Sequence, residues 1–151
     1  MIRKATEEDV ETIKALIDHY SKKKIMLSRT KANIINNLQE FFVFEEAKEI
    51  IACVALHAYE GQIYEVRSFA VKEGMCGKGF GKQLLEHIMQ KAKANGTKHL
   101  FTLTLKPEFF EKAGFERVDK YNLSHKIWND CINCPKYNNA CDEIALEIWL
   151  A

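Results

Sequence analysis

The sequence IYEVRSFAV at residues 63–71, followed by GMCGKGFGKQLLEHIMQKAKAN at residues 74–95, decides the fold. The first segment is rich in β-branched and aromatic residues, which predicts a strand over 63–71. In the second segment apolar residues recur at helical spacing, which predicts a helix from about Phe80 to Asn95 that ends at Gly96. The residues expected on its inward face are Leu84, Leu85, Ile88, Met89 and Ala92.

The glycine-rich loop between that strand and that helix predicts an anion site. Gly77, Gly79 and Gly81 alternate along the loop, and glycine lets successive backbone N–H groups converge on one point without a Cβ clash. The N-terminus of the following helix adds a partial positive charge, so the loop suits a pyrophosphate. Lys78 and Lys82 stand where they could add phosphate contacts. The alternative interpretation is a tight glycine turn that holds no ligand.

Two common nucleotide-binding loops do not fit this run. The dinucleotide fingerprint G-x-G-x-x-G does not match, because the glycines here alternate. The ATP-type loop is also disfavoured, because Cys76 occupies its first glycine position and Gln83 follows Lys82 where a serine or threonine is needed. The pattern therefore favours phosphate binding by another class of loop.

The rest of the chain carries helical and strand patterns without an internal repeat or a linker. We expect a strand over 2–5, a helix capped by Thr6, a helix over 31–40 with Ile34, Ile35 and Leu38 inward, strands over 41–45, 50–59 and 99–105, a short helix from Pro107 that Gly114 ends, and closing strands over 115–123 and 143–150. That order predicts an α+β (mixed α/β) architecture in which a twisted sheet is flanked by helices. Residues 1–151 are expected to form a single domain.

Charge and cysteine content disfavour several functional classes. The chain has 22 basic and 21 acidic residues, so its formal net charge of +1 gives no electrostatic reason to expect nucleic acid or a membrane as a partner. The N-terminus lacks the apolar run of a signal peptide, and we expect a cytoplasmic location. Five cysteines, an odd number, argue against a disulfide framework.

Two motifs resemble those of the GNAT family of N-acetyltransferases. Residues 68–71 and 77–85 resemble the family's motif A, and PEFFEKAGF at 107–115 resembles its motif B. The resemblance covers essentially the whole chain, with the elements in the expected order. It implies the fold of that family, acetyl-CoA as the acyl donor and an N-acetyltransferase activity. A homodimer is a further expectation, because members of the family often form dimers.

The resemblance also implies where acetyl-CoA binds. Backbone groups of Phe69 and Val71 would meet the pantetheine arm, and we expect the two parallel strands to splay after Val71, so that the acyl chain lies in the gap like a strand. A backbone N–H near Phe69 or Ala70 could serve the oxyanion. The residues that would cradle the pyrophosphate, together with the residue before them, are Cys76, Gly77, Lys78, Gly79, Phe80, Gly81 and Lys82. Cys76 departs from the family pattern, in which arginine or glutamine usually precedes the glycines. Phe110, which we count with the cofactor-binding residues, stands where many members carry a tyrosine that protonates the leaving thiol.

Shorter segments resemble one branch of the family, the single-domain N-acetylglutamate synthases of arginine biosynthesis. They are LSRT at 27–30, EVRSFAV at 65–71, Leu103-Thr104, Phe109-Phe110 and a tail that starts with KIWNDC at 126–131 and runs to Ala145. This likeness implies L-glutamate as the acceptor, and a dicarboxylate calls for guanidinium partners. We therefore predict that Arg29, Arg67, Ser68 and Thr104 bind the substrate. The alternatives are another small amine as acceptor, or a protein that binds acyl-CoA as a sensor without turnover.

Glu65 is the predicted catalytic residue. Residues two apart in a strand share a face, so Glu65 and Arg67 should project together beside the acyl site. A carboxylate at that place would take a proton from the acceptor ammonium, most simply through water. The alternative is that Glu65 and Arg67 form a structural ion pair on a half-exposed strand.

Three cysteines near the C-terminus, Cys131, Cys134 and Cys141, are closely spaced. With His125 or Asp142 as a fourth ligand they would suit zinc, although a strong zinc signature has two paired knuckles. An iron–sulfur cluster fits less well. We expect unligated thiols here and no metal requirement.

Overall fold

The computed structural model describes residues 1–119 and 143–150. In chain order its helices and strands are β1 (Ile2–Lys4), α1 (Val10–Lys22), α2 (Lys31–Asn36), β2 (Phe41–Glu46), β3 (Glu49–Tyr59), β4 (Ile63–Val71), α3 (Phe80–Ala94), β5 (His99–Thr104), α4 (Pro107–Glu111), β6 (Glu116–Val118) and β7 (Ile144–Trp149). Short 3₁₀ turns at Glu7–Asp9 and Leu38–Glu40 precede α1 and β2. Within residues 1–119 and 143–150, no helix combines the length and the apolar character that crossing a bilayer requires.

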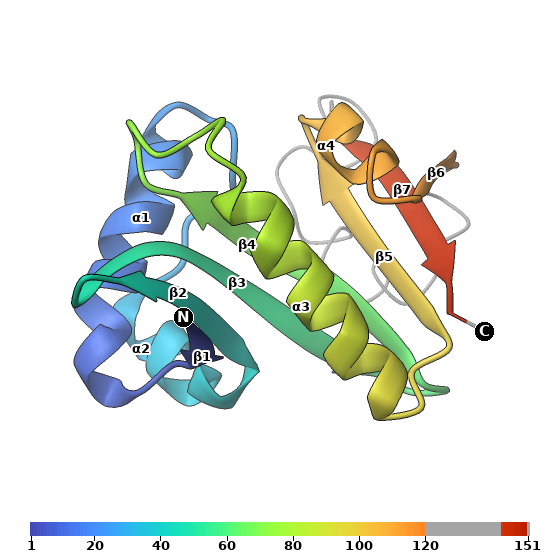
Figure 1. The fold of residues 1–151 in the computed structure, drawn as a ribbon, viewed down its shortest axis with the longest axis horizontal. Helices are drawn as coiled ribbons and strands as arrows, with labels where there is room; N and C mark the ends of the chain where they lie inside the picture. The colour runs from blue at the N-terminus through green and yellow to red at the C-terminus, as the bar shows by residue number, and fades with distance from the viewer. Residues whose placement is uncertain (120–142, 151) are drawn as a thin grey trace.

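The strands form one seven-stranded sheet in the order β1-β2-β3-β4-β5-β7-β6. Neighbouring strands are antiparallel except β4 and β5, which run parallel. The parallel pair requires a crossover, and α3 supplies it by carrying the chain back over one face of the sheet. Figure 1 shows α3 across this face, with α1 and α2 on the opposite side. A mixed sheet flanked by helices confirms the predicted fold class.

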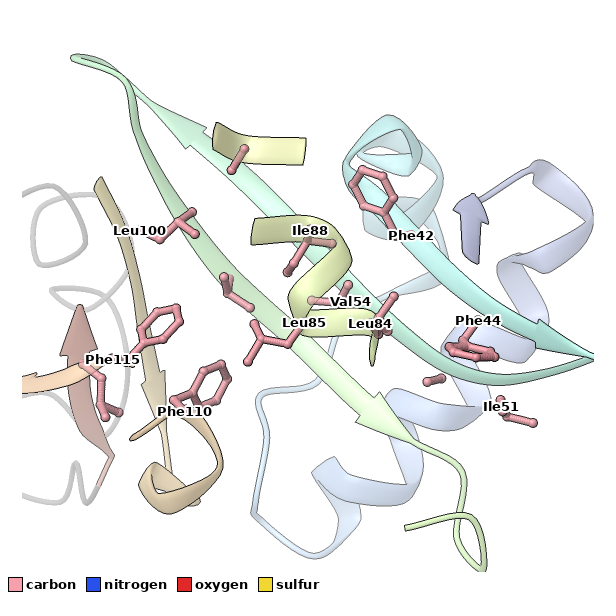
Figure 2. Close-up of a cluster of buried hydrophobic side chains, with 14 residues drawn as sticks. Phe42, Phe44, Ile51, Val54, Leu84, Leu85, Ile88, Leu100, Phe110 and Phe115 are labelled. Carbon is pink, nitrogen blue, oxygen red and sulfur yellow. The ribbon is translucent and has the colours of Figure 1, made fainter. Parts of the chain in front are cut away.

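Two hydrophobic cores hold the helices to the sheet. In the first core, Leu84, Leu85 and Ile88 of α3 point toward the strands (Figure 2). Ala92 is buried with them and Met89 is partly buried, which confirms the inward face predicted for this helix. The other residues of this core include Phe42, Phe44, Ile51, Val54, Val66, Leu100, Phe110 and Phe115. The second core lies on the opposite face, where the α1 and α2 residues Ile13, Ile17 and Ile34 pack against Val43, Cys53 and Ala55.

The helix predicted over 31–40 is shorter than expected. It ends at Asn36, because the backbone of Asn37 leaves the helical conformation, with φ −119° and ψ 23°. The side-chain amide of Asn37 donates to the carbonyl oxygen of Asn33 at 2.8 Å. A 3₁₀ turn follows at Leu38–Glu40. The prediction that Ile35 faces inward is also wrong. Ile34 is buried, whereas the side chain of Ile35, one residue around the helix, is exposed.

The parallel strands β4 and β5 separate earlier than expected. We predicted that they splay after Val71, but the pairing runs only from Ile63 opposite His99 to Glu65 opposite Phe101. Beyond it the Thr102 hydroxyl donates to the carbonyl oxygen of Val66 at 2.8 Å, a side-chain link that marks the point of separation. Figure 1 shows the two strands diverging toward the end where α3 begins. The second half of β4 therefore presents a backbone edge that β5 does not cover.

Candidate active site

A β-bulge at Ser68 shapes the second half of β4. Cys53 of β3 pairs with Ala70 and Ala55 pairs with Arg67, so β4 carries one residue more than β3 over this interval. Ser68 takes a positive φ of 54°, and the Cys53 thiol lies 3.6 Å from its carbonyl oxygen as a donor. Burial raises the pKa of Cys53 to about 12, which keeps the thiol protonated for this contact.

The bulge resets which residues face each side of the sheet. Before it, Glu65 and Arg67 face the side of α1 and α2, as the strand alternation predicts. After it, Phe69 and Val71 pack against the core under α3, while Ala70 belongs to the opposite core. A side-chain site before the bulge and a backbone edge after it therefore meet at Ser68.

Ser68 and three residues near it, Arg29, Glu65 and Arg67, form what we call the acceptor face. Nη1 of Arg67 lies 3.5 Å from Oε1 of Glu65, and Nη1 of Arg29 donates to Oγ of Ser68 at 3.1 Å. The structure thus brings together three of the four predicted substrate-binding residues and the predicted catalytic carboxylate. The hydroxyl of Tyr59 also donates to Oε1 of Glu65, at 3.0 Å.

Arg29 is held in place from three directions. Besides Ser68, its guanidinium donates through Nε to Oδ1 of Asn33 at 2.7 Å and lies 4.9 Å from the ring centre of Phe41. Burial lowers the pKa of Arg29, and the positive charge of Arg67 lowers it further. Two partly buried guanidinium groups repel each other, and an anion bound between them would stabilise the positive charge of both.

Thr104, the fourth predicted substrate residue, lies elsewhere. Phe101 and Leu103 of β5 pack with Tyr59 on the acceptor side, so strand alternation places Thr104 on the side of α3. Its hydroxyl accepts a hydrogen bond from the backbone N–H of Lys106 at 2.9 Å, in the turn before α4. The structure therefore does not join Thr104 to the acceptor face.

The glycine loop, which we call the cofactor loop (residues 74–82), leads from β4 to α3. Gly77 and Gly79 take φ values of 81° and 88°, and Gly79 is the residue before the first turn of α3. A Cβ at Gly81 would lie 3.3 Å from Cγ2 of Val71 and 3.4 Å from the Phe109 ring, so glycine lets α3 begin close against the end of β4. The loop and the 15-residue helix behind it fit a pyrophosphate.

The side chains of the cofactor loop contribute in different ways. Cys76, Lys78 and Lys82 are exposed, and Nζ of Lys82 lies 4.0 Å from a carboxylate oxygen of Glu86. Phe80 is partly buried and packs edge-on against Phe44. The loop therefore offers backbone and cations outward, and uses Phe80 to fix its position.

Tyr20 links α1 to this region, a contact that the sequence pattern did not reveal. Its hydroxyl donates to the carbonyl oxygen of Val71 and lies 3.6 Å from Sγ of Cys76. The backbone N–H of Lys72 donates to the carbonyl oxygen of Ile51 in β3. The carbonyl group of Val71, in the same peptide unit, therefore points to the opposite edge of β4. Burial raises the pKa of Tyr20 well above its usual range, so the hydroxyl stays a donor.

Phe110 lies in the core under α3, with only 4% of its surface exposed. Its ring packs edge-on against Phe69 and Phe115. The neighbouring Phe109 is the ring that contacts both Phe69 and the Gly81 region. Sequence reasoning named Phe110 by its place in the motif and missed Phe109, because the pattern does not tell which of two adjacent aromatic residues faces the loop.

Sequence reasoning also missed a hydrogen-bonded pair of side chains beside the acceptor face. Nδ1 of His57 lies 2.8 Å from Oε2 of Glu40, and both side chains are partly buried. His57 is the direct cross-strand partner of Glu65, and its ring meets Tyr59 edge-on at 4.9 Å. Strand register is the signal that could have drawn attention to His57, because it places His57 opposite Glu65 once the hairpin at Gly61 is fixed.

The metal question concerns two parts of the chain. In residues 1–119 and 143–150 no three histidine, cysteine or acidic side chains come together in a way that would hold a metal ion. The cysteines that suggested zinc, Cys131, Cys134 and Cys141, lie outside the described residues, as do His125 and Asp142.

Comparison with known proteins points to one family. Residues 37–117 match the family model of the acetyltransferase (GNAT) domain. An uncharacterized N-acetyltransferase from Chlorobaculum tepidum is 37% identical over 145 residues, which cover 96% of this chain and 93% of that protein. An amino-acid acetyltransferase from Mycobacterium tuberculosis is 29% identical over 141 residues, 91% of this chain and 79% of that protein.

A solved structure matches over the full length of this chain. It is N-acetylglutamate synthase from Neisseria gonorrhoeae, complexed with coenzyme A and N-acetyl-glutamate, with a TM-score of 0.89 and 28% sequence identity. The match covers 100% of this chain and 35% of the synthase, so this chain corresponds to about a third of that protein.

Proposed function

Because this chain belongs to the acetyltransferase (GNAT) family and transfers acetyl groups from acetyl-CoA to an amine, we propose that its acceptor is the α-amine of L-glutamate. The product would be N-acetylglutamate, the first intermediate of arginine biosynthesis. The observation that carries the proposal is the pairing of Arg29 and Arg67 on the acceptor face, where two guanidinium groups flank Ser68 and Glu65. Two such groups suit a dicarboxylate and disfavour a cationic acceptor.

Two relatives support this acceptor. The Mycobacterium tuberculosis relative is named for amino acids as acceptors, and the Neisseria gonorrhoeae synthase was solved with N-acetyl-glutamate bound. Both are similar to this chain over more than nine-tenths of its length. We take residues 1–151 to be one catalytic domain, because the first and last described strands belong to the same sheet.

Acetyl-CoA would bind along the uncovered edge of β4 and over the cofactor loop. Backbone groups of Phe69 and Val71 would meet the pantetheine arm, because β5 turns away from this edge. The N–H groups of residues 77–82 would hold the pyrophosphate, with Lys78 and Lys82 as exposed cations nearby. The thioester would then lie near the bulge, between the backbone edge and the acceptor face.

The reaction would be a direct attack of the amine on the thioester. Arg29, Arg67 and Ser68 would hold the carboxylates so that the amine approaches in attack geometry. Glu65 would take the proton from the ammonium through a bridging water, because its side chain is only 2% exposed. The backbone N–H of Phe69 would stabilise the oxyanion, and the thiol, with an ordinary pKa of about 8.5, would leave without help from Phe110.

The experiment that tests the acceptor measures thiol release from acetyl-CoA with each of the twenty amino acids, and identifies the product by mass. We expect the highest kcat/KM with glutamate and the lowest with lysine, whose side-chain ammonium meets the two guanidinium groups. A higher kcat/KM with a cationic or apolar amino acid would contradict the assignment of glutamate. It would leave the acetyltransferase activity untouched.

A further inference from the structure

Glu65 needs a route by which its proton reaches solvent. Acetylation of an ammonium group by acetyl-CoA yields the amide, coenzyme A as the free thiol and one proton. In the proposed function that proton passes to Glu65, and the present inference rests on this role. The Glu65 side chain is 2% exposed even with no ligand bound, so release of its proton straight to bulk water is hindered. A more exposed neighbouring group that accepts the proton would open a faster route.

His57 is placed to accept that proton. It lies directly opposite Glu65 on β3, and residues opposite each other on antiparallel strands share a face with Cβ atoms about 5 Å apart. The His57 side chain is 28% exposed, so unlike Glu65 it reaches water. Histidine is also the side chain whose ordinary pKa lets it both take and release a proton near neutral pH.

Glu40 sets the tautomer of His57. A carboxylate only accepts hydrogen bonds, so Nδ1 of His57 donates to Oε2 of Glu40 across 2.8 Å, and Nε2 is left as the acceptor. The other carboxylate oxygen, Oε1 of Glu40, is buried and has no hydrogen-bond partner among the described residues. The negative charge of Glu40 is therefore available to stabilise an imidazolium ring.

The other charged and titratable groups around the ring have mixed signs. Tyr59 meets it from β3, and Glu65 with its partner Arg67 faces it from β4. Arg29, from the segment before α2, interacts electrostatically with both Glu40 and Arg67. Charges of both signs therefore lie on the elements that pack around His57.

We propose that His57, held by Glu40, relays the proton of each turnover from Glu65 to solvent. In the first step the Glu65 carboxyl gives its proton to Nε2 of His57, directly or through one water, and returns to a carboxylate. In the second step the imidazolium releases that proton from Nε2 to water or to a buffer base. One proton enters and one leaves, so both residues are restored. His57 does not touch the substrate; it acts through Glu65.

The test is the substitution His57→Gln, assayed by thiol release with saturating acetyl-CoA and the amino acid that the wild type acetylates fastest. We expect kcat to fall about tenfold at low buffer concentration, while both KM values change less than about twofold. Adding imidazole at constant pH and ionic strength should restore kcat along a saturable curve. The matched control is His87→Gln on α3, whose ring packs edge-on against Phe42 on the other face of the sheet and should keep the wild-type rate.

Several outcomes would overturn the relay. Wild-type kcat in His57→Gln would do so, and so would a lowered kcat that imidazole does not restore. If this variant does not fold, the wild type answers the question in D2O. Its kcat at low buffer should fall about twofold, and imidazole should reduce that isotope effect. An isotope effect that imidazole leaves unchanged would overturn the relay.

The relay and the role of Glu65 fail in different ways. If Glu65→Gln retains wild-type activity, Glu65 is not the base and the relay falls with it. If Glu65→Gln is inactive and His57→Gln is fully active, only the relay is wrong. The identity of the acceptor affects neither result, because the assay uses whichever amino acid is acetylated fastest.

Discussion

The cofactor loop and the acceptor face lie at the two sides of the Ser68 bulge and are built from different parts of the chain. The cofactor loop presents backbone: Gly74, Gly77 and Gly79 take positive φ values, and its side chains other than Phe80 and Met75 are exposed. The acceptor face presents side chains, and partners from other elements fix Arg29, Glu65 and Ser68, as Asn33 and Phe41 fix Arg29. One region should therefore tolerate changes of side chain, and the other should not.

Glu65→Gln should have the largest effect. The amide keeps the size of the side chain and can still accept from Tyr59, but it cannot take a proton. We expect kcat/KM to fall by about 10²-fold or more, measured by thiol release across pH. An unchanged rate and pH profile would remove Glu65 from the mechanism and weaken the claim that the acceptor face depends on single side chains.

Arg29→Lys should raise KM for glutamate by about tenfold, equivalent to about 1.4 kcal/mol, with KM for acetyl-CoA nearly unchanged. Lysine keeps the charge but loses the planar fork that contacts Ser68 and Asn33 together. Arg117→Lys is the matched control, because Arg117 makes a two-pronged contact with Glu111 on the surface near α4. Equal effects of the two substitutions on KM for glutamate would contradict the specific role of Arg29.

Gly79→Ala should raise KM for acetyl-CoA several-fold, because φ at this position is 88° and the strained loop would no longer aim its N–H groups together. Gly61→Ala provides the control, since Gly61 has a similar φ of 82° in the turn between β3 and β4. Both substitutions should lower the free energy of unfolding by about 1 kcal/mol, as thermal or denaturant unfolding would report. Only Gly79→Ala should affect acetyl-CoA. A similar change in KM from both would mean that the loop backbone has no special role.

Cys76→Ser should have the smallest effect, a change in KM for acetyl-CoA of less than about twofold. The Cys76 side chain is exposed, and its contacts with Tyr20 and with backbone carbonyl groups can be made by a hydroxyl. Steady-state kinetics of the two proteins would measure this. A tenfold change would show that the cofactor loop depends on this side chain after all.

The same contrast explains what could be predicted from the sequence. Glycine spacing and helical periodicity are local, so the loop and the bounds of α3 could be predicted within a residue or two. The bulge at Ser68 depends on a buried thiol from β3 and a register shift, which no local pattern encodes. The end of the β4–β5 pairing after Glu65 and the side of the sheet on which Thr104 lies depend on how β5 pairs, which no local pattern encodes either.

Partners brought from distant segments were the least predictable. Tyr20 and Val71 are 51 residues apart in the chain, and Glu40 and His57 are 17 apart. His57 alone looks like an ordinary strand residue, and it gains meaning only beside Glu40 and opposite Glu65. Glu65 and Arg67 lie on the same face, as strand alternation alone predicts, and their side chains are 3.5 Å apart.

The pairing of β4 with β5 ends at Glu65, and this affects both amide exchange and the stability of the fold. Amide groups of β4 beyond Glu65 that point away from β3 would exchange their hydrogens with solvent readily in the free protein. If acetyl-CoA occupies this edge, it completes the sheet as a missing strand would, and these amides should exchange slowly. Binding would also stabilise the whole fold by mass action, by about 2.7 kcal/mol at a hundred times the dissociation constant. The donor would then be, for as long as it stays bound, a structural part of the protein.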